Sequence, residues 1–279
     1  MPPVVTAARY ALPLREGGSL PAVVETGRGP FAVKFLGAGQ GARALVAELI
    51  VGQIAERLGL PLPDLALVEL EEGFGRAEPD PEIQDILRAS VGLNVGLRFL
   101  DAALPYDPVG TAGLFGPELA ADVVWLDTLV TNIDRTPRNP NLLVAGEPPR
   151  PWLIDHGAAL YFHHDWPGVD EARARAPFPA IRDHVLLPVA DALTDADARL
   201  APLLDADFLR GALDAVPDAM LMHAPEGREA PFATPEANRN AYLAYFTARL
   251  DGPRAWVTAA EEARKTRQAE KPETLDYRR

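Results

Sequence analysis

No cysteine occurs among the 279 residues of this chain. Disulfide bonds, thiolate catalysis and cysteine-ligated metal sites are therefore excluded. The sequence also lacks a run of about 18 uninterrupted apolar residues, which a membrane-spanning helix would need. Residues 1–5 contain no basic segment that leads into an apolar stretch, so no secretory signal peptide is expected. Together these absences predict a cytoplasmic protein.

Positive charge is scarce. The chain has 27 Lys and Arg against 40 Asp and Glu, which gives a formal net charge of -13. This balance argues against direct binding to nucleic acid or to an anionic membrane. A nucleotide would also be repelled at long range, so its binding requires a locally positive cleft or a metal ion. Hydrophobic residues make up 48% of the chain, which is enough to bury a core.

The first third of the sequence has the pattern of short strands and one long helix. Extended runs at residues 20–25 and 31–35 are separated by glycine-containing turns. Apolar residues then recur at helical spacing over residues 42–58. Strand-like runs follow at residues 65–70 and 94–100. The pattern predicts a small, β-rich unit that carries one helix.

The rest of the chain has a different character. Residues 102–116 are rich in Pro and Gly and are typical of a linker, whereas residues 117–130 and most of residues 183–265 have a helical pattern. This order predicts an α+β fold. We expect a kinase-like arrangement of two lobes, with a β-rich N-lobe over residues 1–101 and a larger helical C-lobe over residues 102–279.

Asp134, Asn139 and Asp155 form the most informative pattern. An Asp, an Asn five residues later and a second Asp after a short apolar run is the arrangement that kinases use for phosphoryl transfer. The first Asp can orient or deprotonate the attacking hydroxyl, while the Asn and the second Asp can hold Mg²⁺. The alternative is a polar turn followed by an ordinary strand, because motifs of this size recur by accident.

Two upstream residues strengthen the pattern. Lys34 lies in an expected strand, where a lysine can reach the α and β phosphates of ATP, and Glu48 lies on the next helix, where it can pair with that lysine.

Gly17, Gly18 and Ser19 form a candidate loop over the phosphates, with an ordinary hairpin turn as the alternative. We also consider Ser19 a candidate autophosphorylation site because of its place in this loop.

The chain resembles the HipA-like kinases, within the wider group related to phosphatidylinositol 3- and 4-kinases. The resemblance spans roughly residues 8–165. It is carried by residues 32–34, by the helix and its Leu-Gly-Leu-Pro ending over 44–61, by residues 132–135 with Asn139, and by residues 154–157.

The resemblance implies a protein-kinase-like fold that uses ATP and Mg²⁺. It further implies that Phe99, Leu100 and Asp101 form a hinge whose backbone meets the adenine. The site residues follow the same order, with Lys34 and Glu48 at the phosphates, Asp134 as catalytic base, and Asn139 and Asp155 at magnesium. One departure is Thr136, which stands where the family's catalytic loop often has His.

Three functional hypotheses remain open at the level of sequence. The first is an active phosphotransferase whose acceptor is a hydroxyl, foremost a protein Ser or Thr, with a small molecule or a lipid as alternatives. The second is a nucleotide-binding pseudokinase or regulatory binding module, which the shortened glycine loop and Thr136 favour slightly. The third is an α+β protein with an accidental motif. The sequence determines neither the acceptor nor the oligomeric state.

Several residues near the motif have expected supporting roles. Asn132 is expected to steady the loop by hydrogen bonding to backbone, and Asp127 either does the same or faces solvent. His163 and His164 are adjacent, and neighbouring residues of an extended chain point to opposite faces, which argues against a joint metal site. His184 is interpreted as structural.

Overall fold

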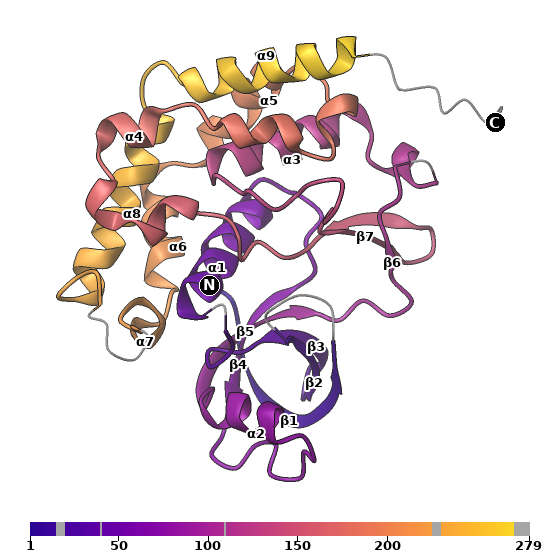
Figure 1. Ribbon diagram of the computed structural model, residues 1–279, viewed down its shortest axis with the longest axis vertical. Helices are drawn as coiled ribbons and strands as arrows, with labels where there is room; N and C mark the ends of the chain where they lie inside the picture. Colours follow the sequence, from indigo (N-terminus) through magenta and orange to yellow (C-terminus); the bar gives the residue numbers. More distant parts are fainter. Residues whose placement is uncertain (15–19, 40, 109, 225–229, 271–279) are drawn as a thin grey trace, which may run out of the picture.

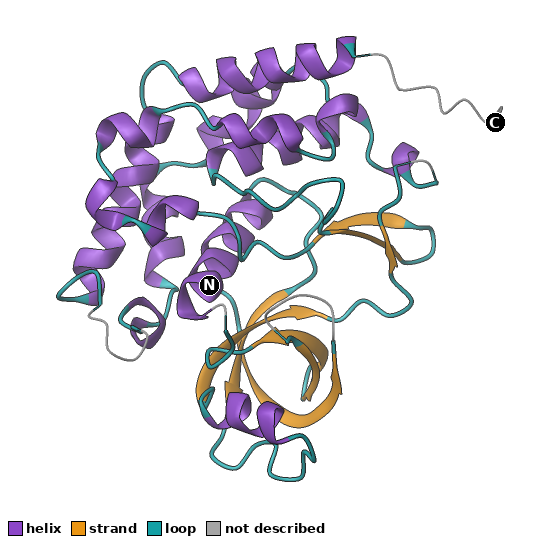
Figure 2. Ribbon diagram, in the orientation of Figure 1, coloured by secondary structure: helices purple, strands orange, loops and turns teal. Residues whose placement is uncertain are grey.

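The computed structural model describes residues 1–14, 20–39, 41–108, 110–224 and 230–270. The protein is a mixed α/β structure, with a β-rich N-terminal region and a helical C-terminal part (Figure 1). The strands of the N-terminal region gather at one end of the molecule and most of the helical residues at the other, with a few further strands between them (Figure 2). The predicted order of strands, then helices, is confirmed.

A closed barrel forms the N-terminal region. Its strands follow the order β1-β2-β3-β5-β4 and pair antiparallel, except for the parallel pair β1 and β4. The strands are β1 (Val4–Pro13), β2 (Ala22–Thr26), β3 (Gly29–Lys34), β4 (Leu65–Leu70) and β5 (Gly92–Arg98).

The barrel interior is filled by side chains from alternate strand positions. Val24, Phe31 and Val68 belong to this core. Gly96 of β5 is a place of close approach, because a Cβ there would lie 2.8 Å from Val68 and 3.2 Å from Phe31. The short helix α2 (Pro81–Arg88) contributes Leu87 to the same core.

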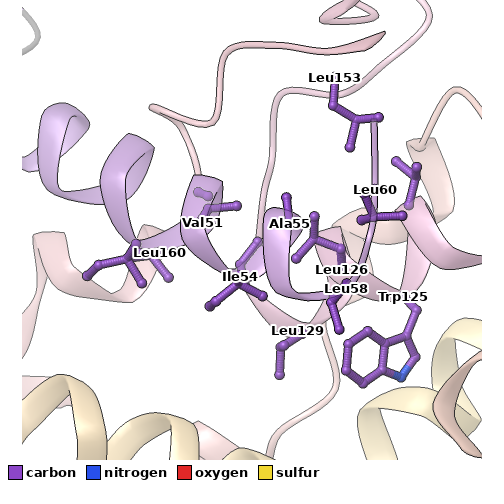
Figure 3. Close-up of a cluster of buried hydrophobic side chains, with 14 of the residues drawn as sticks. Val51, Ile54, Ala55, Leu58, Leu60, Trp125, Leu126, Leu129, Leu153 and Leu160 are labelled. Carbon is purple, nitrogen blue, oxygen red and sulfur yellow. The ribbon is translucent and has the colours of Figure 1, made fainter. Parts of the chain in front are cut away.

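Helix α1 (Gly41–Arg57) joins the barrel to the helical part. It is apolar nearly all round, which is typical of a helix buried on every side. It contacts β4 and β5 on one side and α6 and α7 on the other. Figure 3 shows α1 side chains among residues of the C-terminal part, with these members labelled: Val51, Ile54 and Ala55 of α1, and Leu126, Leu129 and Leu160. Both regions therefore fix the position of α1.

The C-terminal part consists of helices and short 3-10 turns in the described residues. The helices are α3 (Pro117–Leu129), α4 (Glu171–Arg175), α5 (Leu193–Leu200), α6 (Ala206–Asp214), α7 (Asp218–Leu221), α8 (Pro235–Leu250) and α9 (Ala255–Ala269). The 3-10 turns are η1 (Ala112–Leu114), η2 (Tyr161–His164), η3 (Trp166–Gly168), η4 (Pro179–Asp183), η5 (Leu187–Val189) and η6 (Ala201–Leu203).

A second, small sheet lies between the two regions (Figure 1). It has the order β6 (Leu104–Pro105), β7 (Leu142–Ala145) and β8 (Arg150–Leu153), all antiparallel. The interpretation of residues 102–116 as linker is thus only partly right, because β6 pairs there with a strand far along the chain. The β7–β8 hairpin has a direct consequence for the site, since it carries the chain from the polar loop to Asp155.

Candidate active site

Lys34 is the point where three parts of the fold meet. Its ammonium Nζ lies 2.6 Å from Glu48 Oε2 on α1 and 2.6 Å from Asp155 Oδ1 in the segment after β8. The Lys34 side chain is 14% exposed, and that of Asp155 is 36% exposed. The pairing of Lys34 with Glu48 is the one that the sequence predicts. The contact between Lys34 and Asp155, 121 residues apart, joins the barrel to the loop region.

The charges of this pair are mutually stabilised. Burial by itself lowers the pKa of Lys34, but the adjacent carboxylates of Glu48 and Asp155 raise it more, so the net shift is upward. Burial likewise raises the pKa of Glu48, but Lys34 and the hydrogen bond from His156 outweigh it and hold the pKa well below its usual range. Lys34 therefore stays cationic and Glu48 anionic at neutral pH.

Glu48 also holds the segment that carries Asp155. The backbone N–H of His156 donates to Glu48 Oε2 at 3.0 Å, and His156 Nδ1 lies 3.4 Å from Oε1. Asp155 itself has a φ of +53°, in the left-handed region that costs a non-glycine residue about 1 kcal/mol or more. Gly157 fits closely beside it, because a Cβ there would lie 3.3 Å from Lys34 Nζ. The turn at Asp155 is therefore tightly constrained.

The polar loop orients the carboxylate of Asp134. Its Oδ2 accepts a hydrogen bond from Asn139 Nδ2 at 2.7 Å and from Asn141 Nδ2 at 3.3 Å. Its backbone N–H donates to Asn132 Oδ1 at 3.1 Å, which confirms the expected backbone contact of Asn132. Thr136 closes the turn with Asn139 through two backbone hydrogen bonds of 3.1 Å. Asp134 and Asn139 are therefore brought into contact.

Beneath this loop lies a buried polar cluster. Of the two alternatives for Asp127, exposure to solvent is wrong, because the residue is fully buried. Its carboxylate bonds to the side chains of Asn132, Arg135 and His184 rather than to backbone. Arg135, which follows Asp134 directly, is not among the residues that the sequence predicts to be functional. The sequence offers one indication of its importance: Arg135 lies in a loop in which Asp134 and Asn139 are predicted to be functional.

The predicted phosphate loop and the predicted adenine hinge both stay predictions. Gly17, Gly18 and Ser19 lie outside the described residues, so their assignment stays a prediction. Phe99, Leu100 and Asp101 follow β5 where the chain leaves the barrel, and the N–H of Phe99 donates to Pro30 O at 3.0 Å. That location fits a connection between the two regions, and the adenine contact stays a prediction.

The histidines after Asp155 take part in packing. His163 is buried and its Nδ1 lies 2.9 Å from the hydroxyl of Tyr242. Phe162 stacks on Tyr245, with ring centroids 3.5 Å apart. This segment is thus held against α8 by aromatic contacts.

Comparison with known proteins identifies the family of this chain. A family model described as HipA-like kinase matches residues 27–172, more than half of the chain. The chain belongs to the HipA-like kinase family. The matched range contains Lys34, Glu48, Asp134, Asn139 and Asp155, and membership of a kinase family supports a phosphotransferase in general terms.

A solved structure is similar over nearly the whole of this HipA-like kinase. The crystal structure of the Helicobacter pylori proinflammatory kinase CtkA matches 93% of this chain and 99% of its own, with a TM-score of 0.53 and 13% sequence identity. At that identity the similarity shows the fold alone. Within the part of the chain that the structure describes, no helix has the length and apolarity to cross a membrane.

Proposed function

We propose that this HipA-like kinase is an ATP- and Mg²⁺-dependent phosphotransferase that transfers the γ-phosphoryl group to a hydroxyl, foremost that of a protein Ser or Thr. The observation that carries the proposal is the contact of Lys34 Nζ with both Glu48 and Asp155 at 2.6 Å. A cation held by a buried carboxylate, beside a second, partly exposed carboxylate, suits a phosphate chain and its metal ion.

The donor set fits magnesium. Asp155 offers a partly exposed carboxylate, and Asn139 uses its amide nitrogen on Asp134, which leaves the amide oxygen for a cation. Mg²⁺ prefers such oxygen ligands and takes its remaining positions from phosphates and water. Bound there, the ion would neutralise charge on the β and γ phosphates. Lys34 would hold the phosphates and Glu48 would keep it in place.

Asp134 is the proposed catalytic base. Hydrogen bonds from Asn139 and Asn141 fix the direction of its carboxylate, which remains half-buried and accessible. The acceptor oxygen forms a bond to the γ phosphorus as the bond to the bridging oxygen of ADP breaks, and the hydroxyl proton passes to Asp134. Most of the acceleration in such a site comes from positioning and from neutralised charge.

The fold suits an arrangement of two lobes. Residues 1–101 contain the barrel and α1, and residues 102–279 contain the small sheet and the remaining long helices. We propose that these are the N-lobe and the C-lobe, that residues 99–101 meet the adenine, and that residues 17–19 cover the phosphates.

Thr136 does not argue strongly for an inactive pseudokinase. Thr136 makes two backbone hydrogen bonds with Asn139, and its Oγ1 also accepts from the Asn139 N–H at 3.4 Å, so the turn is closed without a His side chain. The net charge of -13 disfavours a lipid acceptor at an anionic membrane and leaves proteins and small molecules as candidates.

The test is ATP binding and hydrolysis by the purified chain with and without Mg²⁺. We expect slow, Mg²⁺-dependent release of phosphate that Asp155→Asn abolishes while the protein stays folded. Binding of ATP with no release, and with no transfer to any protein or small-molecule hydroxyl, would indicate a pseudokinase. Absence of ATP binding would overturn the proposal.

A further inference from the structure

The buried cluster beneath the polar loop is built around one carboxylate. Asp127, near the end of α3, is fully buried, and burying a carboxylate is unfavourable unless hydrogen bonds and opposite charge compensate it. Its Oδ1 accepts from Asn132 Nδ2 at 3.0 Å. Its Oδ2 accepts from Arg135 Nε at 2.5 Å and from His184 Nε2 at 2.9 Å. Burial raises the pKa of Asp127, but the charge of Arg135 and the hydrogen bond from His184 outweigh it and hold the pKa well below its usual range.

Arg135 also bonds to the backbone of both segments that hold proposed catalytic residues, the polar loop and the segment after β8. Its Nη1 donates to the carbonyl of Asn141, at the end of the polar loop, and to the carbonyl of Ile154 at 3.3 Å. The N–H of Ile154 in turn donates to the Asn141 carbonyl at 3.1 Å. In the sequence, Arg135 follows Asp134 and Ile154 precedes Asp155. One guanidinium therefore ties together the backbone on which the proposed base and the proposed metal ligand stand.

The tautomer of His184 follows from its two contacts. The backbone N–H of Leu186 donates to His184 Nδ1 at 3.1 Å, so Nδ1 has no proton and Nε2 carries it toward Asp127. Burial, assisted by the charge of Arg135, lowers the pKa of His184 although Asp127 acts in the opposite direction. His184 is therefore a neutral donor that keeps the carboxylate of Asp127 aimed at Arg135.

We infer that Asp127, Arg135 and His184 form a positioning unit that sets the separation of Asp134 from Asp155. The inference rests on the proposed function, because it assigns these residues to the same phosphotransfer site. All three side chains are buried, and their polar contacts lead to the backbone beside the reactive residues. A second path runs through Asn132, which bonds to Asp127 and to the N–H of Asp134.

The unit should govern turnover more than nucleotide binding. The contact of Lys34 with Glu48 does not involve Arg135, and Glu48 separately holds the N–H of His156 next to Asp155, so ATP affinity should persist when the unit is disturbed. A shift of about 1 Å in a catalytic group can lower a rate by about 100-fold. Loss of the unit should therefore reduce kcat and leave the dissociation constant of ATP nearly unchanged.

The experiment compares two substitutions at His184 in the full chain. In His184→Gln the amide nitrogen takes the place of Nε2 and keeps the donor to Asp127, whereas the shorter side chain of His184→Asn does not reach. Phosphate release from Mg²⁺-ATP and ATP binding are measured for both, together with thermal unfolding. Arg199→Gln is the matched control, because Arg199 pairs on the surface with Asp122 of α3, the helix that also carries Asp127.

We expect His184→Asn to lower kcat by about 10- to 100-fold, with ATP affinity within about twofold of the parent. His184→Gln and Arg199→Gln should stay within about threefold in both quantities. If His184→Asn does not fold, Arg135→Lys decides by the same criteria, since a lysine cannot contact Asp127 and the two carbonyls at once.

Other outcomes overturn the inference. Equal turnover of folded His184→Asn, His184→Gln and parent would show that the cluster only stabilises the fold. An equal loss of turnover in both variants would show that the hydrogen bond from residue 184 to Asp127 does not position the site. A parent chain that neither binds nor hydrolyses ATP would remove the proposed function together with this inference. The parent measurement thus separates the two failures.

Discussion

Two buried carboxylates, one in each region, have similar chemistry and different surroundings. Glu48 is held by Lys34, whose other partner is Asp155, and Asp155 is 36% exposed. Asp127 is held by Arg135, and both side chains of that pair are 0% exposed. Lys34 can exchange its contact with Asp155 for a ligand because the Asp155 side chain reaches solvent. The pair of Asp127 with Arg135 has no such route.

A histidine completes each centre, and here too the two differ. His156 approaches Glu48 at 3.4 Å, a long contact, while its backbone N–H makes the stronger 3.0 Å bond. His184 donates to Asp127 at 2.9 Å and accepts from the backbone at 3.1 Å, so both of its ring nitrogens are engaged. Under the proposed function, the open centre serves the chemistry and the closed centre holds the open one in shape.

The largest effect is expected at the open side of the site. Asp134→Ala should lower turnover of Mg²⁺-ATP with an acceptor by about 100- to 10,000-fold, because it removes the proposed base. Stability should change little, since Asp134 is half-buried, its partner Asn139 is exposed, and the buried Asn141 keeps its bond to the backbone carbonyl of residue 134. The measurement is kcat together with urea unfolding. A normal rate would remove Asp134 from its assigned role.

At the closed centre, Asp127→Ala should act mainly on stability. It leaves the guanidinium of Arg135 buried without its counter-charge, which costs about 3–5 kcal/mol. Urea unfolding measures the loss. A change below about 1 kcal/mol would mean that water or another group compensates Arg135, and the contrast with Glu48 would weaken.

Acid should destabilise the protein through its buried histidines. Burial lowers the folded-state pKa of His163 and His184, whereas the unfolded chain takes up protons near the ordinary value of 6.5. Below pH 6.5 the folded state therefore binds fewer protons than the unfolded state. The free energy of unfolding has its full value above pH 6.5 and falls as the pH drops below it. Asp127 and Arg135 face His184, and Tyr242 faces His163.

Urea unfolding at a series of pH values from 7 to 5 measures this effect. His184→Gln, which cannot titrate, should show a shallower loss than the parent. Equal pH profiles for the two proteins would exclude a contribution from His184.

The smallest effect is expected from a surface ion pair between α5 and α3. Arg199→Gln breaks the contact with Asp122 at 2.8 Å, but the arginine is 43% exposed, and such pairs contribute about 0.2–1 kcal/mol. Neither turnover nor ATP binding should change. A loss comparable with that of Asp127→Ala would show that burial is not what distinguishes the two ion pairs.

Much of the fold could be predicted from local patterns. The helix expected at residues 42–58 is observed as Gly41–Arg57, and the strand expected at 65–70 is observed as Leu65–Leu70. The sequence predicts strands from Tyr10 onward, whereas the first strand begins at Val4. Many β1 side chains are exposed, so the strand has little hydrophobic signal and is defined by pairing with β2 and β4.

The small sheet was missed for a related reason. β6 is two residues long, and β7 and β8 have four residues each. Segments of that length carry too little periodicity to be recognised, and they exist because they pair with one another.

The sequence by itself determined the reactive residue types and their order: Lys34, Glu48, Asp134, Asn139 and Asp155. The sequence gives the chemical identity and the spacing of these residues directly, and the proposed phosphotransfer site requires these groups. Only the tertiary structure decided which of these groups touch, because a contact such as that of Lys34 with Asp155 joins residues 121 apart.

The tertiary structure also decided how deeply each charge is buried. Asp127 and Arg135 look like ordinary polar residues in the sequence, and their importance comes from the surrounding core that excludes water. Burial removes solvent as a competing partner, so a carboxylate must then be held by specific donors. That requirement arises only when distant segments pack together, and no local pattern in the sequence records it.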